Sequence, residues 1–254
     1  MKKIFLLAGA MALLVASSCK KDNNSNGNNN GGETTRQLKK VTKTENGKTT
    51  IYNLTYDGSK LTSFSSTDNL ESTAFTYDGS GNMVKLDIRG NSYYSTYTYT
   101  YNNGTPVSGT VKVIHKIPGE PDDLVQDDVL SYTVTNNQVT RIKQEMKLAD
   151  MEQIANITYN SNGNVEKLTT EGDETIAVSF TYGTKKPGYP TITQWVLDAG
   201  YTMQFHAKNE VVTAFYDFPG TQLDNTITTK YTYDGKGYPL TSDDGETQLK
   251  YEYQ

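Results

Sequence analysis

The amino-acid sequence predicts an all-β protein: an up-and-down antiparallel meander of about 18 strands that closes into a barrel or flattened barrel. Three observations lead to this prediction. Short segments alternate polar and apolar residues with period two, as half-buried strands do. Turn residues Asp, Asn and Gly recur between them, at spacings of mostly 20 to about 26 residues per pair of strands. The chain is also rich in strand-forming Thr and Tyr, with 19 Tyr.

The chain begins with an export segment. Lys2 and Lys3 precede an apolar run at residues 4–16, which has signal-peptide length and is too short to span a bilayer as a helix. Val15-Ala16-Ser17-Ser18-Cys19 resembles the bacterial lipobox, although Ala16 stands where Leu or Val is usual. An ordinary cleavage site is the alternative. Cys19 is the only cysteine and can form no internal disulfide, so residues 1–18 are interpreted as a signal peptide and Cys19 as the lipidated residue.

Residues 19–33 are predicted to form a disordered, Asn- and Gly-rich tether. The stretch from Lys20 to Gly32 has no apolar residue and, as a flexible coil, spans on the order of 20 Å. The residues after Cys19 resemble those of Bacteroidota lipoproteins, in which an acidic run favours display on the cell surface. Only Asp22 is acidic here, so the sequence leaves open which face of the outer membrane carries the protein.

Residues 34–254 are predicted to be a single barrel-like domain without substantial helix. Strands ending in Tyr are followed by Asp/Asn/Gly turns, with the clearest copies at residues 75–86, 157–168 and 231–240. Tyr97, Tyr99 and Tyr101 share one strand face, which is expected to point inward. Predicted turns include residues 183–188, Ala199-Gly200 and Lys208-Asn209.

The Tyr-Asp-x-x-Gly phrase resembles the YD repeats of Rhs-type proteins, which form long antiparallel β-spirals. The combination of a lipobox with about nine such hairpins resembles an uncharacterised family of Bacteroidota lipoproteins with a porin-like β fold. This resemblance covers essentially the whole chain. It implies a fold and brings no functional residue with it.

Charge and motifs narrow the possible functions. The net charge is −5 and no basic stripe is present, which excludes nucleic acid as an expected partner. His115 and His206 are far apart in sequence, so neither a metal nor any other cofactor is expected. Glu120, Asp122, Asp123, Asp127 and Asp128 are interpreted as a solvated acidic loop rather than a calcium site. Trp195 is either a sugar-stacking platform or, more commonly for such a residue, core packing.

The favoured interpretation is a monomeric, non-enzymatic lipoprotein of the outer membrane that binds a glycan or an envelope protein. An enzyme with a dispersed acidic site and a membrane-inserted channel are the alternatives. In an up-and-down meander, successive turns alternate between the two ends of the sheet. With an even number of strands, both termini therefore lie at the end with the Tyr-Asp/Asn turns. The lipid tether at the N-terminus then places this end nearest the membrane. The longest connections, residues 117–126 and 218–224, then point away from it. Their residues are the candidate binding loops: Glu120, Asp122, Asp123, Phe218 and Pro219.

Overall fold

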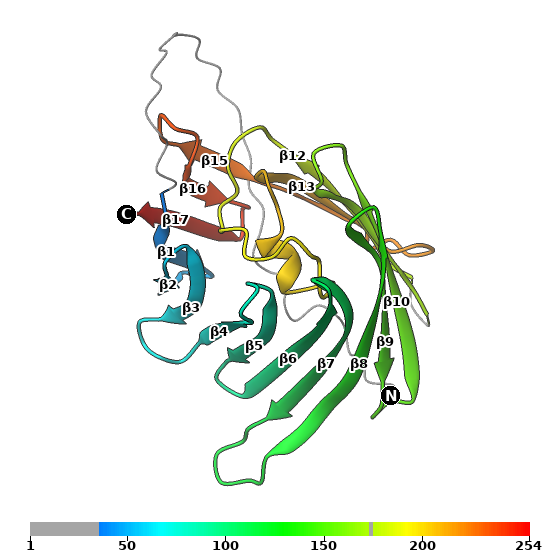
Figure 1. The fold of residues 1–254 in the computed structure, drawn as a ribbon. Helices are drawn as coiled ribbons and strands as arrows, with labels where there is room; N and C mark the ends of the chain where they lie inside the picture. Colours follow the sequence, from blue (N-terminus) through cyan, green and yellow to red (C-terminus); the bar gives the residue numbers. More distant parts are fainter. Residues whose placement is uncertain (1–35, 173–174) are drawn as a thin grey trace.

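The computed structural model describes residues 36–172 and 175–254. Within these residues, 17 strands form one antiparallel sheet that curls into a nearly closed barrel (Figure 1). Strands that follow each other in sequence lie beside each other in the sheet, which confirms the predicted all-β meander. The signal peptide, Cys19 and the tether lie outside the described residues.

The strands have the following bounds. The first nine are β1 (Leu38–Glu45), β2 (Lys48–Asp57), β3 (Lys60–Ser66), β4 (Ser72–Tyr77), β5 (Met83–Arg89), β6 (Tyr93–Asn102), β7 (Thr105–His115), β8 (Asp123–Thr135) and β9 (Gln138–Met146). The others are β10 (Met151–Tyr159), β11 (Val165–Glu171), β12 (Ala177–Tyr182), β13 (Val211–Asp217), β14 (Asn225–Thr228), β15 (Lys230–Tyr233), β16 (Pro239–Asp243) and β17 (Thr247–Tyr253). One short 3-10 helix, η2 (Thr202–Phe205), lies between β12 and β13.

The first and last strands join. β1 pairs antiparallel with both β2 and β17, which is the closure that the sequence predicts for an even number of strands. The 17 strands behave as an even number because β14 and β15 run on as one interrupted strand. β14 and β15 follow each other with only Thr229 between them; β14 pairs with β13, and β15 pairs with β16. The Thr229 amide donates to the Val212 carbonyl at 2.7 Å, so the bonding to β13 continues at this break. Closure protects the backbone edges that would otherwise pair with other chains.

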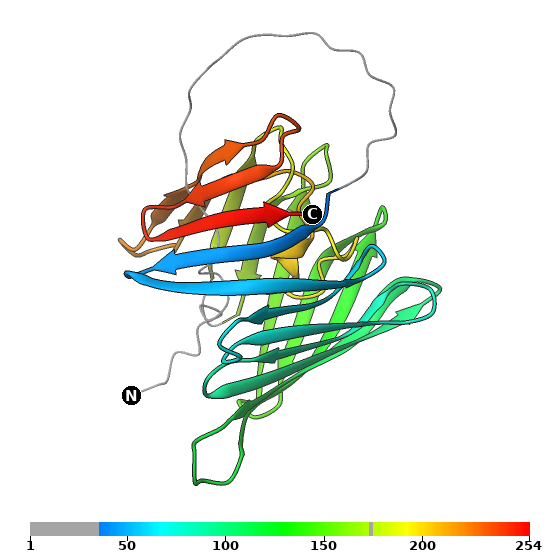
Figure 2. The same ribbon diagram turned by 90° about the vertical axis from the view of Figure 1, so that its left-hand side faces the viewer.

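The barrel has two rims that differ in construction. The terminal rim carries both chain ends and the turns β2–β3, β4–β5, β6–β7, β8–β9, β10–β11 and β15–β16. There the Gln254 amide donates to the Gln37 carbonyl at 3.0 Å, and the Gln37 side chain donates to the Gly58 carbonyl. The opposite end, the far rim, carries the remaining hairpin turns. Figure 2 shows the C-terminus at one end of β17 and the β1–β2 turn at the opposite end of the barrel.

Before four of the six terminal-rim turns, a tyrosine hydroxyl hydrogen-bonds to the neighbouring strand. The Tyr77 hydroxyl donates to the Leu61 carbonyl at 2.8 Å, and the register of the hairpin shifts beside the same tyrosine. A bulge of this kind bends the strand and increases its twist, which helps a sheet to curl. The same pairing recurs for Tyr56 with Leu38, Tyr101 with Met83, Tyr159 with Val139, and Tyr182 with Val165.

The Asp or Asn after this tyrosine holds the turn. One carboxylate oxygen of Asp78 accepts the backbone N–H groups of Ser80 and Asn82, at 2.9 and 2.8 Å. Asn160 and Asp234 accept the equivalent pairs of backbone N–H groups in their own turns. Asx turns of this type satisfy donors that the sheet leaves unpaired. The repeated Tyr-Asp/Asn phrase is therefore a device for closing hairpins and joining them side by side.

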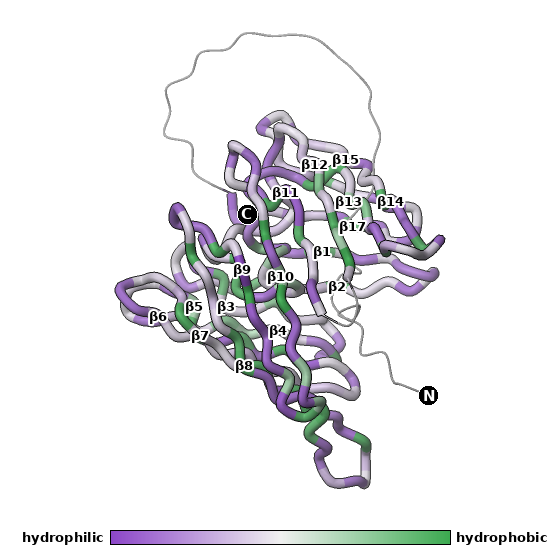
Figure 3. Tube along the Cα trace, turned by 90° about the vertical axis from the view of Figure 1, so that its right-hand side faces the viewer, coloured by the Kyte–Doolittle hydropathy of each residue, from purple (hydrophilic) through white to green (hydrophobic). Residues whose placement is uncertain are grey.

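The strands place apolar residues inside and polar residues outside. Val41, Leu86 and Val139 are fully buried in the interior, and Tyr99 is buried with them. Figure 3 shows the resulting alternation of hydrophobic and hydrophilic residues along β8, β9 and β10. Outward positions carry Thr pairs, such as Thr98 with Thr110, and ion pairs, such as Lys143 with Glu152. The inward assignment of the tyrosine faces is confirmed.

The chain between β12 and β13 departs from the predicted meander. Turns were predicted at residues 183–188, Ala199-Gly200 and Lys208-Asn209, with two strands between them. Residues 183–210 instead form an inward segment, which contains η2 and lies inside the ring of strands (yellow in Figure 1). Pro187 and Pro190 disfavour ladder pairing at its start, and Trp195-Val196-Leu197 is a continuous apolar run rather than an alternating one.

The inward segment completes the core. Its Trp195, Val196, Leu197 and Phe205 are all buried in the main hydrophobic cluster of the barrel. The Phe205 ring meets Phe75 of the wall edge-on, with centroids 5.5 Å apart. A Cβ on Gly188 would lie 2.7 Å from the Tyr251 hydroxyl, so the segment enters the barrel where only glycine fits without displacement.

Candidate functional site

The first predicted binding loop is shorter than expected. β8 begins at Asp123, where residues up to 126 were assigned to a loop, because Asp123 and Leu124 pair with the end of β7. The β7–β8 hairpin consequently projects beyond the barrel wall at the far rim (Figures 1 and 2). Glu120 and Asp122 are exposed near its tip, and Asp122 forms an ion pair with Lys116 at 3.0 Å.

The second predicted loop is the β13–β14 connection, also at the far rim. Phe218 is half-buried and its amide donates to the Asp224 carboxylate at 2.9 Å, whereas Pro219 is exposed. The two loops lie at well separated points of the far rim in both views (Figures 1 and 2). The fold places the five candidate residues at one end of the barrel, as predicted, but it does not gather them into one cluster.

Exposed apolar side chains mark the far rim, and sequence reasoning did not single them out. Leu148 and Met151 border the β9–β10 turn, which lies beside the projecting hairpin because β8 pairs with β9. The full set of large, exposed hydrophobic residues in or next to far-rim turns is Leu70, Tyr93, Ile117, Leu124, Leu148, Met151 and Leu223. In the sequence, the leucines among these side chains could have been recognised as single leucines within otherwise polar turns.

Trp195 and the two histidines are not assembled into a site. Trp195 is only 3% exposed, which corresponds to the packing alternative, and its Nε1 has no hydrogen-bond partner among the described residues. His206 is buried in the same segment, and burial lowers the pKa of its imidazole, keeping it neutral. His115 instead stacks on Tyr93 at the far rim, with centroids 4.5 Å apart. Residues 36–172 and 175–254 hold no cluster of three or more potential metal ligands.

Three carboxyl side chains are buried among the described residues: Asp128, Asp198 and Glu210. Asp128 was expected in the solvated acidic loop, but it lies in β8 and is only 1% exposed, so that expectation was wrong for this residue. Asp128 and Asp198 lie inside the barrel. Asp198 accepts hydrogen bonds from the Tyr99 hydroxyl at 3.1 Å and the Gly200 amide at 2.9 Å. Asp128 accepts the side-chain amides of Gln126 and Gln144. Burial raises the pKa of both carboxyl groups, and these hydrogen bonds oppose the rise. Both acids are therefore engaged by the fold itself.

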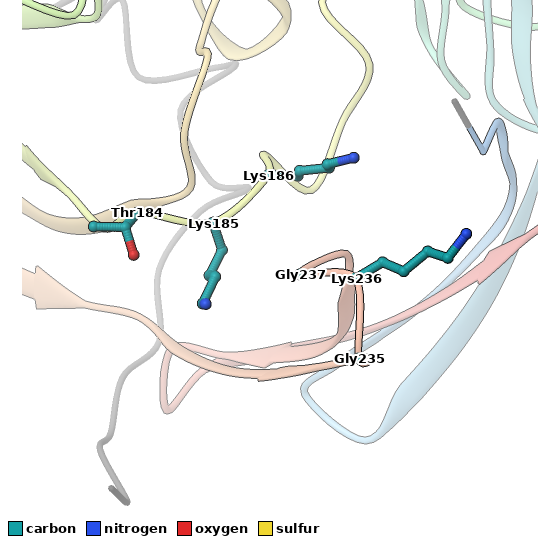
Figure 4. A pocket seen from close by; sticks show the side chains of 6 residues that line it. All are labelled: Thr184, Lys185, Lys186, Gly235, Lys236 and Gly237. Carbon is teal, nitrogen blue, oxygen red and sulfur yellow. The ribbon is translucent and has the colours of Figure 1, made fainter. Parts of the chain in front are cut away.

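The terminal rim holds an open, basic cleft of about 320 Å³. Thr184, Lys185 and Lys186 line it from the start of the inward segment; Gly235, Lys236 and Gly237 line it from the β15–β16 turn (Figure 4). The two sides are joined by a backbone hydrogen bond from the Lys186 amide to the Gly237 carbonyl, at 3.1 Å.

Charges are distributed unequally between the rims. The far-rim connections are acidic: β7–β8 contains Glu120 and Asp122, and β16–β17 contains Asp244 and Glu246. On the terminal rim, Lys60, Lys208 and Arg36 add to the lysines of the cleft. Two of the acids there are engaged: Asp234 pairs with Arg36 at 2.9 Å, and Asp78 holds its own turn.

The described residues thus form an all-β, nearly closed antiparallel barrel with a packed interior. No helix among them is long and apolar enough to cross a bilayer. No protein-family model matches the sequence, and a search of curated proteins found no match.

The fold is similar to solved structures. A porin-like protein from Bacteroides vulgatus ATCC 8482 matches with a TM-score of 0.55 and 12% identity, over 87% of this chain and 99% of that one. A porin-like protein from Bacteroides uniformis ATCC 8492 matches with a TM-score of 0.51 and 14% identity, over 85% of this chain and 96% of that one. The porin-like β fold expected from the sequence is supported; lipid attachment and kinship with Rhs-type repeats stay predictions.

Proposed function

We propose that this protein is a lipid-anchored, non-enzymatic barrel of the bacterial outer membrane that binds an envelope protein at its far rim. The observation that carries the proposal is the concentration of exposed Leu, Ile and Met side chains in far-rim turns, at the end opposite both termini. Exposed apolar groups within a polar rim are typical of interaction sites. Their aliphatic character favours a protein partner over a glycan.

The outer wall and the interior argue against a channel. A membrane-inserted barrel needs an apolar band around its outside and, to conduct, a water-filled lumen. Here outward positions carry charged residues such as Lys143, Glu145 and Glu152, and the inward segment packs into the core. The polar outer wall is suited to contact with water rather than lipid. Attachment to the membrane would therefore depend on the lipid on Cys19. The protein could face the periplasm or the cell exterior from that anchor.

The buried acids give little support to the enzyme alternative. Glycosidase carboxylates must reach a substrate and a water molecule. Asp128 and Asp198 are buried and accept hydrogen bonds from protein groups. A glycan-binding alternative has one favourable observation, the exposed Tyr93 ring at the far rim. A glycan array with wild type and Tyr93→Ala would expose that alternative, because tyrosine-dependent retention of a sugar contradicts a purely protein partner.

The anchor is tested by labelling cells with a fatty-acid analogue. Wild-type protein should be labelled and Cys19→Ser should not, because Cys19 is the only thiol in the chain. The wild type should also resist extraction with high salt and dissolve in detergent, while the variant is released without detergent. Equal labelling of both proteins would overturn the lipid assignment.

The binding rim is tested with photo-crosslinking residues introduced one at a time into cells. Leu124, Leu148 and Leu223 sample the far rim; Val107 and Leu240, exposed apolar residues close to terminal-rim turns, are matched controls. The proposal expects one discrete adduct from far-rim positions and none from the controls. Adducts of equal yield at both ends, or no adduct from any far-rim position, would contradict it.

A further inference from the structure

The basic cleft on the terminal rim has a composition suited to anions. Lys185, Lys186 and Lys236 all line one open cleft, with Thr184 beside them. The structure records no ion pair for Lys185 or Lys236 within residues 36–172 and 175–254. The Lys186 ammonium lies 4.0 Å from the centroid of the Tyr238 ring, which helps to position it.

The two sides of the cleft are held in place by the fold. The Lys185 amide donates to the buried Glu210 carboxylate at 2.7 Å, and the Tyr233 hydroxyl donates to the same carboxylate at 3.0 Å. Asp234 fixes the opposite turn by accepting the Lys236 amide at 2.8 Å. Lys185 and Lys236 contribute only their backbone amides to these contacts, and Figure 4 shows the side chains of both.

The position of the cleft relative to the chain's start suggests what covers it. Arg36, the first described residue, bonds to Asp234 in the turn that lines the cleft. The described chain therefore begins beside the cleft, at Arg36. Under the proposed lipidation of Cys19, the tether predicted from the sequence would keep this rim within a short distance of a bilayer. The sequence adds Lys20 and Lys21 next to Cys19. An anionic lipid surface attracts basic groups at about this range, and the attraction falls off within a Debye length.

We propose that the terminal rim docks on an anionic membrane surface, with Lys185, Lys186 and Lys236 contacting phosphate groups of the lipid headgroups. The docked barrel stands with its acidic far rim directed away from the bilayer, since like charges repel that end. The lipid tethers the protein, and the cleft sets its orientation. This inference rests on the proposed function, because it assumes that the protein is carried on a membrane.

Binding to vesicles tests the inference without the lipid anchor. The protein used is residues 19–254 with Cys19→Ser; it retains every described strand, and the sheet closes on itself within Leu38–Tyr253. Sedimentation is measured with vesicles of phosphatidylcholine alone and with phosphatidylglycerol added, at low and high salt. The cleft variant is Lys185→Gln/Lys186→Gln/Lys236→Gln. The matched control, with the same change in charge, is Lys48→Gln/Lys116→Gln/Lys147→Gln at the far rim.

The inference expects salt-sensitive binding to the anionic vesicles only. The cleft variant should bind about 10-fold more weakly or worse, given the attraction expected for each basic residue near such a surface. The far-rim variant should bind within about twofold of the parent protein. Unchanged circular dichroism and thermal melting of both variants would show that folding is intact.

Several results would overturn the inference. Absence of binding to anionic vesicles would do so, as would equal weakening by the two triple variants. Displacement by inorganic phosphate well beyond that by chloride of equal ionic strength would assign the cleft to a free phosphate instead. Because this protein carries no lipid, its result is separate from the fatty-acid labelling. Labelling without vesicle binding defeats the docking surface alone, and vesicle binding without labelling defeats the anchor alone.

Discussion

The two rims of the barrel are built from the same strands in different ways. Four of the six terminal-rim hairpins have a tyrosine hydroxyl that bonds to the neighbouring strand, and three of the six have an Asx side chain that holds the turn. Tyr77 and Asp78 show both features in one hairpin. Far-rim connections vary in length and sequence, from the tight turn at Asn46-Gly47 to the projecting β7–β8 hairpin. These hydrogen bonds constrain most hairpins of the terminal rim. The irregular rim is left free to present side chains such as Leu124 and Leu148 to solvent.

The largest expected difference concerns two tyrosines on the same strand. Tyr99, on the terminal half of β6, is 4% exposed and its hydroxyl bonds to Asp198, whereas Tyr93, at the far end, is 50% exposed. Tyr99→Ala should lower the free energy of unfolding by about 3 kcal/mol or more, through a cavity and a lost hydrogen bond. Tyr93→Ala should change it by less than about 0.5 kcal/mol. Urea unfolding measures both changes. Similar losses of unfolding free energy at the two positions would contradict the assignment of Tyr99 to the core and of Tyr93 to the surface.

The tyrosine–carbonyl bonds of the terminal rim should each have a measurable effect. Tyr77→Phe removes only the hydroxyl that donates to the Leu61 carbonyl, and should cost about 1 kcal/mol of unfolding free energy. Tyr93→Phe is the control, since the structure records no hydrogen bond for that hydroxyl within the described residues. If Tyr77→Phe changed the unfolding free energy as little as Tyr93→Phe does, the tyrosine of the repeat would stabilise the hairpin through packing alone.

The buried acids and the turn acids should respond to pH in opposite directions. Burial raises the pKa of Asp128, so the folded state holds its proton more tightly than the unfolded chain, and stability falls as pH rises above the ordinary value of 3.8. Asp128→Asn should flatten this loss above about pH 4. Urea unfolding at a series of pH values from about 4 upward measures this effect. An equal dependence of unfolding free energy on pH in wild type and variant would contradict the prediction.

Asp234 on the terminal rim provides the opposite case. Burial opposes the shift, but backbone N–H groups of Tyr238 and Lys236 hold the pKa of this carboxyl below its usual value. Its contribution is therefore present above the unfolded-state pKa and is lost as pH falls through the lowered one. Asp234→Asn should remove part of the acid sensitivity below about pH 4, seen in the same denaturation series. If Asp234→Asn lost stability at low pH as steeply as the wild type, the Asp234 carboxylate would not contribute to stability in this way.

The smallest expected effect on stability is at the far rim. Leu223 is 68% exposed, and Leu223→Ser should alter the unfolding free energy by less than about 0.5 kcal/mol. Shortening the β7–β8 and β13–β14 connections should likewise leave thermal melting nearly unchanged while removing the partner crosslink. Binding that survives both changes, and is lost when terminal-rim turns are altered, would reverse the assignment of the rims.

The sequence predicted most of the wall because its rules are local. Period-two alternation and Asp/Asn/Gly turns sufficed for strands such as β4 and β5, and parity sufficed for the pairing of β1 with β17. The same rules failed at residues 183–210, where Gly183, Ala199-Gly200 and Lys208-Asn209 resemble hairpin turns. That segment obeys a non-local requirement: the interior needs apolar volume, and Trp195 and Phe205 supply it.

The candidate site was less predictable than the fold. The far-rim loops were located correctly by parity, but their separation around the rim depends on which strands lie between them. The basic cleft joins residues about 50 positions apart, Lys185 and Lys236, through the departure of the inward segment from the wall. A pattern search along the chain cannot bring such residues together, because the segment that connects them is itself the irregular one.

The orientation of the two rims is tested most directly by energy transfer to a labelled bilayer. Gly79 and Gly90 lie in the turns at opposite ends of β5, and neither has a positive φ. A Cβ at Gly79 would meet open space, and one at Gly90 would make an ordinary contact with the Tyr93 carbonyl oxygen at 3.9 Å. The seven residues of β5 separate the two turns by about 20 Å. Gly79→Cys and Gly90→Cys, each placed in the lipid-anchored protein on anionic vesicles, receive the same donor dye, with an acceptor in the lipid headgroups. The account predicts strong transfer from position 79 and weak transfer from position 90. Equal transfer, or stronger transfer from position 90, would contradict the claim that the terminal rim faces the membrane.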